Sequence, residues 1–213
     1  MRGSKKKNVN PAAAHTMKIR ESGMPEQAYW ESLFDVPAIL DAFGFNLNPN
    51  RQSNPCDIVE VGCGYGTFAL PLAQRIHGTF HALDVDSTMV RTTARRATEA
   101  GIKNLHTSVR DVLSDGFGLP PGSCAAALLF NILHAEAPLA LLRGARDIIQ
   151  PGGWLTVIHW RSDVPTPRGP PLSIRPTPVQ VLDWAEQTGG LIPPATPLDL
   201  PPWHYGLKFI RSA

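Results

Sequence analysis

The sequence predicts an α/β fold, built as a doubly wound and mostly parallel sheet with helices on both faces. Short β-branched runs alternate with amphipathic segments along residues 57–160, which is typical of parallel strands joined by helices. The first of these runs ends in glycines at the start of a helix. The length of 213 residues fits one domain large enough to fold without a disulfide or metal.

The N-terminal part has apolar residues at helical spacing over Glu26–Phe45. This pattern predicts one or two amphipathic helices, which we expect Pro37 to interrupt. A polar loop bounded by proline follows at Asn46–Pro55. The helical part would lie over the rest of the domain as a lid.

The central part, residues 56–160, carries the expected sheet. Ala125–Asn131 is almost wholly apolar, as expected for a strand buried on both faces. The strands predicted here are Asp57–Val61, Thr79–Leu83, Leu105–Val109, Ala125–Asn131 and Trp154–Trp160. The helices predicted between them are Phe68–His77, Thr88–Ala100 and Leu139–Gln150. Each helix can carry the chain back to begin the next parallel strand.

The last 53 residues differ in composition, since they hold 11 of the 21 prolines. Pro178–Thr188 predicts a helix and His204–Ile210 a closing strand. The proline-rich segment before that helix is expected to rim a binding site rather than to form regular structure.

Composition narrows the class of protein. Hydrophobic content of 43% with 18% charged residues excludes a disordered chain, and no apolar run is long enough to span a membrane. Three cysteines without metal-ligand spacing argue against a disulfide framework or a metal site and favour a reducing compartment. We therefore expect a cytoplasmic protein with no metal and no membrane contact.

The charge is divided unevenly along the chain. Residues 1–16 carry +4 and read as a disordered leader added for expression, so that the domain proper spans 17–213. The other 197 residues hold 16 Lys and Arg against 18 Asp and Glu, a net charge of −2. From this balance we expect no nucleic-acid partner. The alternative is that the basic residues within 1–16 form an arm that binds nucleic acid.

A glycine-rich turn follows the first strand, with the sequence Glu60-Val-Gly62-Cys-Gly64-Tyr-Gly66. It departs from the dinucleotide fingerprint G-x-G-x-x-G, because Thr67 stands where the third glycine belongs. An acid before the turn suits a ligand with positive charge rather than a pyrophosphate. Asp84 follows 22 residues after Gly62, where a carboxylate can accept from both ribose hydroxyls.

These motifs resemble those of the class I S-adenosylmethionine-dependent methyltransferases, bacterial small-molecule type. The resemblance covers about half of the chain and includes four further motifs: Leu83-Asp-Val-Asp86, Arg110-Asp111, Leu129-Phe-Asn-Ile-Leu-His134 and Pro151-Gly-Gly153. It implies a Rossmann-like, seven-stranded sheet. It also implies S-adenosylmethionine as cofactor, with S-adenosylhomocysteine as product, and a small-molecule acceptor methylated by in-line displacement.

The resemblance also implies a set of cofactor contacts. The glycine turn and Glu60 would hold the methionine part, Asp84 the ribose and Asp111 the adenine amino group, with Val85 and Met89 flanking the adenine. The full set is Glu60, Gly62, Cys63, Gly64, Gly66, Asp84, Val85, Met89, Asp111, Val112 and Asn131. The alternative is that the glycines form only a tight turn and that the two aspartates cap helices.

Candidates for the chemistry follow the fourth and fifth strands, because ligands bind outside the carboxyl ends of such strands. His134 is the first choice as general base and His159 the second. For each, the alternative is a surface or core histidine without a catalytic role. The candidate acceptor contacts are Tyr29, Trp30, Arg168, Arg175, Trp203 and Tyr205, with the arginines able to pair with an anionic acceptor.

Rival functions remain open at this point. Methylation of RNA, DNA or protein is one, although Asn131-Ile-Leu-His134 departs from the Asn/Asp-Pro-Pro-Tyr/Phe tetrad of enzymes that methylate nucleic-acid amino groups. A catalytically silent cofactor-binding module and a nicotinamide dehydrogenase are the others. The sequence leaves the methylated atom open, and allows a monomer or a homodimer.

Overall fold

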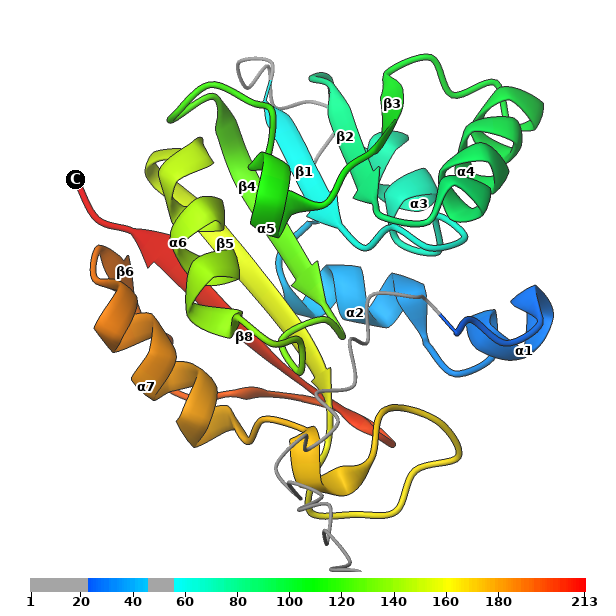
Figure 1. The fold of residues 1–213 in the computed structure, drawn as a ribbon. Helices are drawn as coiled ribbons and strands as arrows, with labels where there is room; N and C mark the ends of the chain where they lie inside the picture. The colour runs from blue at the N-terminus through cyan, green and yellow to red at the C-terminus, as the bar shows by residue number, and fades with distance from the viewer. Residues whose placement is uncertain (1–22, 46–55) are drawn as a thin grey trace, which may run out of the picture.

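The computed structural model describes residues 23–45 and 56–213, and it has an α/β architecture around one central sheet (Figure 1). Within these residues the sheet has eight strands in the order β3-β2-β1-β4-β5-β8-β6, with β7 beside β8. The strands are β1 Asp57–Val61, β2 Phe80–Asp84, β3 Leu105–Val109, β4 Cys124–Phe130, β5 Ile149–Trp160, β6 Leu191–Ile192, β7 Leu198–Leu200 and β8 His204–Arg211.

The direction of the strands divides the sheet into two parts. Strands β1 to β5 pair in parallel, whereas β8 pairs antiparallel with β5, β6 and β7. The strand order runs outward from β1 to β3 and then returns to place β4 on the other side of β1. In such sheets the ligand crevice lies at this reversal, outside the carboxyl ends of the strands.

Helices cover both faces of the sheet. Alternate residues of β4 pack into two cores: Ala127 and Leu129 against α6 and α7, and Ala126 and Leu128 against α2 and α3. The helices of the central and C-terminal parts are α3 Ala69–Ala73, α4 Ser87–Glu99, α5 Val112–Asp115, α6 Pro138–Ile148 and α7 Pro178–Thr188, with a 3-10 turn at Leu172–Ile174. A strand buried on both faces explains why β4 is apolar throughout.

The predicted fold class is confirmed, and the differences are local. The sheet has eight strands rather than seven, because β6 and β7 are two and three residues long and too short to show a periodic pattern. Strand β5 begins at Ile149 instead of Trp154, since the pairing with β4 is interrupted by a register shift and then resumes. Helix α3 is shorter than the predicted Phe68–His77.

The N-terminal part forms two short helices, α1 Gln27–Glu31 and α2 Val36–Ala42. Pro37 begins α2 rather than ending a helix, because the first turn needs no amide from it. Asp35 caps this helix by accepting from the amide of Ala38 at 3.1 Å. The predicted leader over residues 1–16 and the predicted loop over 46–55 lie outside the described residues. Within the described ranges, no helix has the length and apolar character needed to cross a bilayer.

Candidate active site

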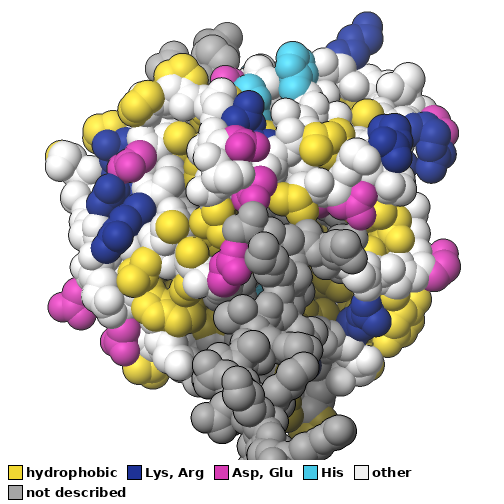
Figure 2. All heavy atoms as spheres, in the orientation of Figure 1, with side chains coloured by type: hydrophobic (Ala, Val, Ile, Leu, Met, Phe, Trp, Pro, Cys, Tyr) yellow, Lys and Arg dark blue, Asp and Glu magenta, His cyan; other side chains and the backbone are white. Residues whose placement is uncertain are grey.

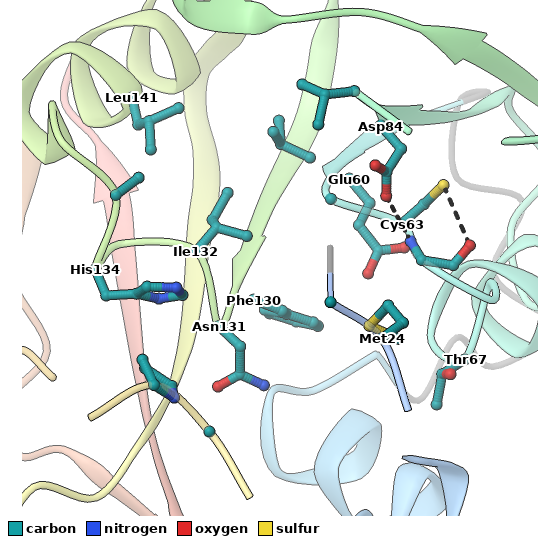
Figure 3. A pocket seen from close by; sticks show the side chains of 18 of the residues that line it. Met24, Glu60, Cys63, Thr67, Asp84, Phe130, Asn131, Ile132, His134 and Leu141 are labelled. Atoms are coloured by element: carbon teal, nitrogen blue, oxygen red, sulfur yellow. Dashed lines mark hydrogen bonds between the residues drawn. The ribbon is translucent and has the colours of Figure 1, made fainter. Parts of the chain in front are cut away.

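A cavity of about 410 Å³ opens at the carboxyl ends of β1, β2 and β4, where the strand order reverses. Its lining includes both polar side chains and aromatic ones. Figure 3 shows Glu60 and Asp84 beside the Cys63 turn, with Asn131 and His134 across the cavity from them. This volume falls in the range of small-molecule sites.

The glycine turn at the end of β1 forms part of the polar side. Gly62 and Gly64 have φ of +78° and +52°, a conformation that glycine adopts without strain. A side chain on Gly62 would also meet Ile132, whose Cγ2 would lie 2.9 Å from the added Cβ. The amide of Gly64 donates to Oδ2 of Asp84 at 2.9 Å, which fixes the turn against the end of β2.

Two carboxylates lie at the ends of neighbouring strands. Glu60 is buried, and this burial raises its pKa well above the usual range, with the nearby Asp84 raising it further. Burial also raises the pKa of Asp84, although the amides of Asp86 and Gly64 oppose the shift by donating to it. A buried acid pair of this kind favours a ligand that brings positive charge or several donors.

Three side chains around the cavity have a buried polar atom without a hydrogen-bond partner among the described residues. They are Oε2 of Glu60, Oγ1 of Thr67 and Oδ1 of Asn131. Asn131 has a φ of +57° at the end of β4, which is uncommon for a residue with a side chain. Unpartnered polar atoms that border a cavity indicate a polar ligand group.

The opposite side of the cavity is formed by aromatic and aliphatic side chains from distant parts of the chain. The ring centroids of Trp30 and Trp160 lie 6.3 Å apart, and those of Phe68 and Phe130 lie 4.9 Å apart. The apolar residues of this wall are Trp30, Phe68, Phe130, Ile132, Leu141 and Trp160. Such a wall accepts an apolar ligand and excludes water.

His134 borders the cavity, and His159 lies behind it in β5. Nδ1 of His134 is 3.3 Å from Nε2 of His159, which is fully buried. Burial lowers the pKa of His134, and the cation of Arg175 lowers it further. Burial, followed by the neighbouring His134, lowers the pKa of His159 to about 3. Both rings are therefore neutral near pH 7, and His134 is the one able to meet a ligand.

A family profile described as a methyltransferase domain matches residues 58–153, the stretch that carries the glycine turn and both strand-end carboxylates. The matches support a methyltransferase domain of the class I S-adenosylmethionine-dependent type over residues 58–153 of this chain.

This chain matches its curated relatives over less than half of their length. Aklanonic acid methyltransferase DauC of Streptomyces sp. (strain C5) is 30% identical over 98 residues, 45% of this chain and 44% of that protein. Nocamycin O-methyltransferase of Saccharothrix syringae is 30% identical over 99 residues, 46% of this chain and 35% of that protein.

Solved structures agree with the fold. An S-adenosylmethionine-dependent methyltransferase from Aquifex aeolicus has a TM-score of 0.73 at 20% identity, covering 87% of this chain and 94% of that one. The cyclase SpnF has a TM-score of 0.68 at 16% identity, covering 91% and 85%. Because a cyclase shares it, the fold alone does not determine the reaction.

The residues present fit the family cofactor. The unpartnered Oε2 of Glu60 suits an ammonium group, and the carboxylate of Asp84 suits vicinal hydroxyls. Of the predicted cofactor contacts, those that line the cavity are Glu60, Gly62, Cys63, Gly64, Asp84, Val85, Asp111, Val112 and Asn131. Gly66 and Met89 do not. A Cβ on Gly66 would lie 2.1 Å from Cδ1 of Leu70, so this glycine permits packing.

The predicted acceptor contacts divide in the same way. Trp30 and Arg168 line the cavity, whereas Tyr29, Arg175, Trp203 and Tyr205 do not. The buried guanidinium of Arg175 donates to the carbonyls of Pro170, Arg161 and Arg168 at 2.8, 2.9 and 3.3 Å. The hydroxyl of Tyr205 donates to the carbonyl of Pro176 at 2.7 Å. Both residues therefore fasten the proline-rich segment, and we correct their predicted role in acceptor binding.

The segment Gly23–Pro25 is a further part of the site that no sequence pattern predicts. Met24 lies over the glycine turn, where its Cε would be 3.2 Å from a Cβ on Gly64. The hydroxyl of Tyr65 donates to the carbonyl of Pro25 at 2.7 Å, and the guanidinium of Arg168 donates to the carbonyl of Gly23. This segment covers the polar end of the cavity.

Proposed function

We propose that this methyltransferase transfers the sulfonium methyl of S-adenosylmethionine to a small-molecule acceptor by in-line displacement. One observation carries the proposal: a single cavity combines buried, unpartnered polar atoms of Glu60, Thr67 and Asn131 with an aromatic wall and His134. The polar end suits the cofactor, and the aromatic end suits an apolar acceptor.

Each residue group has a distinct part in this reaction. Glu60 would hold the ammonium group of the cofactor, Asp84 the ribose hydroxyls and Asp111 the adenine amino group. When bound, S-adenosylmethionine supplies an activated methyl group with a neutral leaving group. The wall around Trp160 would orient the acceptor and exclude water from it, which is the main task of the protein in such a displacement. His134 would remove a proton where the acceptor carries one.

The acceptor class rests on the cavity and on the relatives. The wall is aromatic and aliphatic, which matches an apolar molecule of modest size. Two of the curated relatives carry the small molecules aklanonic acid and nocamycin in their names. We propose an acceptor of the same broad kind.

Calorimetric titration with S-adenosylhomocysteine tests the cofactor end. Asp84→Ala is expected to weaken binding by about 10- to 100-fold, because hydrogen bonds to a charged group contribute about 1.5–3 kcal/mol each. Asp115→Asn is the matched control, since Asp115 is an exposed acid on α5 that does not line the cavity. Equal binding by wild type and Asp84→Ala would contradict the assignment.

Transfer of labelled methyl groups into a bacterial extract, separated by size, tests the acceptor end. Label in the small-metabolite fraction that disappears with Asp84→Ala would support the proposal. Label only in macromolecules would favour methylation of RNA or protein. Binding of S-adenosylhomocysteine without any transfer would favour a catalytically silent module.

The surface favours the small-molecule alternative. On the face shown in Figure 2, Lys and Arg side chains lie among Asp and Glu rather than in one basic stripe. An RNA-binding face would be basic, and its affinity would fall steeply with salt. The three cysteines are free, so we also propose a cytoplasmic location, to be checked by cell fractionation. Light scattering would decide between monomer and homodimer.

A further inference from the structure

The two histidines beside the cavity form an ordered pair. Nδ1 of His159 lies 3.3 Å from the carbonyl oxygen of Trp160, and its Nε2 lies 3.3 Å from Nδ1 of His134. A carbonyl oxygen can only accept, so Nδ1 of His159 must carry the proton for this hydrogen bond to form. A neutral imidazole has one N–H, and Nε2 of His159 is therefore an acceptor.

The protonation of His159 determines which nitrogen of His134 carries a proton. Since Nε2 of His159 accepts, Nδ1 of His134 must donate to it. The remaining nitrogen of His134, Nε2, then carries a lone pair. It has no hydrogen-bond partner among the described residues, and the ring borders the cavity (Figure 3). The hydrogen bond made by one ring nitrogen thus determines the state of the other.

We propose that His159 is a positioning residue that holds His134 with Nε2 unprotonated, and that the acceptor carries an acidic hydroxyl, a phenol or an enol, whose proton this nitrogen removes. The inference rests on the proposed function, because it concerns the acceptor end of the same cavity. It differs from the earlier prediction that His159 is itself catalytic, since His159 lies behind His134 and does not line the cavity.

The surroundings of the pair determine the class of hydroxyl. Arg175 is the cation that acts on His134, and the pKa of His134 lies below its ordinary value of 6.5 because of burial and this cation. The charges of His204 and Arg175 also lower the pKa of His159. The ring of His159 lies 6.4 Å from that of Tyr205, and Glu136 follows His134 by two residues. His134 is therefore a weak base that is already neutral at pH 7.

A weak base matches an acidic proton. A phenol has a pKa of about 10, as in tyrosine, whereas the pKa of an alcohol is far higher and close to that of water. Transfer from a phenol or enol to His134 is therefore far less uphill than transfer from an alcohol. The aromatic wall beside His134 also suits a planar, conjugated acceptor better than a saturated one.

The step balances without a further reactant. The acceptor hydroxyl gives its proton to Nε2 of His134, and its oxygen forms the new bond to the methyl carbon. The electron pair of the broken carbon–sulfur bond remains on sulfur. The proton on His134 leaves to solvent after the product departs, and Nδ1 continues to donate to His159 throughout.

The tautomer is tested first, in the protein without cofactor or acceptor. Long-range nitrogen–proton NMR is expected to show His134 with its proton on Nδ1 and a lone pair on Nε2. His159→Leu should leave a mixture of tautomers, and His159→Gln should restore the single one, because its amide oxygen can accept from Nδ1. His204→Leu is the matched control, a buried histidine that makes no hydrogen bond to His134. A proton on Nε2 of wild-type His134 would overturn the proposal.

The acceptor class is tested on the labelled product recovered from extract. A methyl ether of a phenol or enol is expected, and a product methylated on nitrogen, carbon or an aliphatic alcohol would overturn this part. With the identified acceptor, His159→Leu should lower kcat several-fold with KM nearly unchanged, and His159→Gln should recover it. If S-adenosylhomocysteine fails to bind, the proposed function fails, whereas the NMR result judges the histidine pair independently.

Discussion

The two ends of the cavity are built in different ways. At the cofactor end, positive-φ glycines and a carboxylate that accepts from backbone amides form the site, so the backbone itself is the main structural element. At the acceptor end, side chains from α1, β4 and β5 and from the segment between β1 and α3 meet as an aromatic cluster. The cofactor end should therefore be sensitive to changes in backbone conformation, and the acceptor end to loss of side-chain volume.

The largest expected effect is at the acceptor end. Trp160→Ala removes a fully buried indole that contacts Trp30, Phe34 and His204. We expect the free energy of unfolding to fall by about 3–5 kcal/mol, as for other buried aromatic truncations. Urea unfolding would measure it, with Trp160→Phe as a control that keeps most of the volume. A loss below 1 kcal/mol would show that the cluster contributes little to stability.

Gly66→Ala tests the backbone end. The added Cβ would lie 2.1 Å from Cδ1 of Leu70, at a φ of +76°. Overlap and left-handed strain together should lower the free energy of unfolding by about 2–4 kcal/mol. Gly101→Ala is the matched control, because its φ is +68° and no atom lies within 4 Å of the added Cβ. It should lose only the strain, about 1–2 kcal/mol. If both variants lose the same free energy of unfolding, packing against Leu70 does not explain the glycine at position 66.

Glu60→Gln separates stability from binding. Burial raises the folded-state pKa of Glu60 above the unfolded value of 4.5, so its contribution to stability is fully present below pH 4.5 and is lost as the pH rises from 4.5 through the folded-state pKa. At pH 7 we expect the free energy of unfolding of the variant to exceed that of the wild type by about 0.5–2 kcal/mol, the usual range for a single stabilising substitution. Thermal unfolding would show this gain as a higher midpoint temperature. The gain should vanish near pH 4, and S-adenosylhomocysteine should bind about tenfold more weakly. A less stable variant at pH 7 would contradict this account.

The smallest expected effect concerns the segment over the cavity. Arg168→Ala removes the donor to the carbonyl of Gly23 and should lower the stability of Gly23–Pro25 by about 0.5–1 kcal/mol. Hydrogen exchange of Met24 would report it as faster local opening. Arg161→Ala is the control, since the Arg161 guanidinium pairs with Asp163 within its own loop. If both variants exchange alike, the hydrogen bond to Gly23 does not hold the segment.

Much of the cofactor end could be predicted because its residues are contiguous or end neighbouring strands. The turn from Glu60 to Gly64 and the carboxylate of Asp84 line the cavity, and both are recognisable in the sequence from their spacing. Gly66 and Met89, which are also predicted as cofactor contacts, do not line it, and Gly66 packs against Leu70 instead. In the sequence, Thr67 is notable only because it replaces the third glycine of the dinucleotide fingerprint. In the structure its buried hydroxyl borders the cavity.

The alternation of strands and helices and the motifs at the strand ends can be predicted from sequence, because they depend on neighbours along the chain and on the common edge at which parallel strands finish. Which buried side chains face the cavity depends instead on how distant segments pack together. Periodicity predicts that Trp30, Phe130 and Trp160 are apolar and buried, but not that they meet around one hollow. The contact between His134 and His159 likewise joins residues 25 apart, one after β4 and one near the end of β5, and only folding brings their rings together.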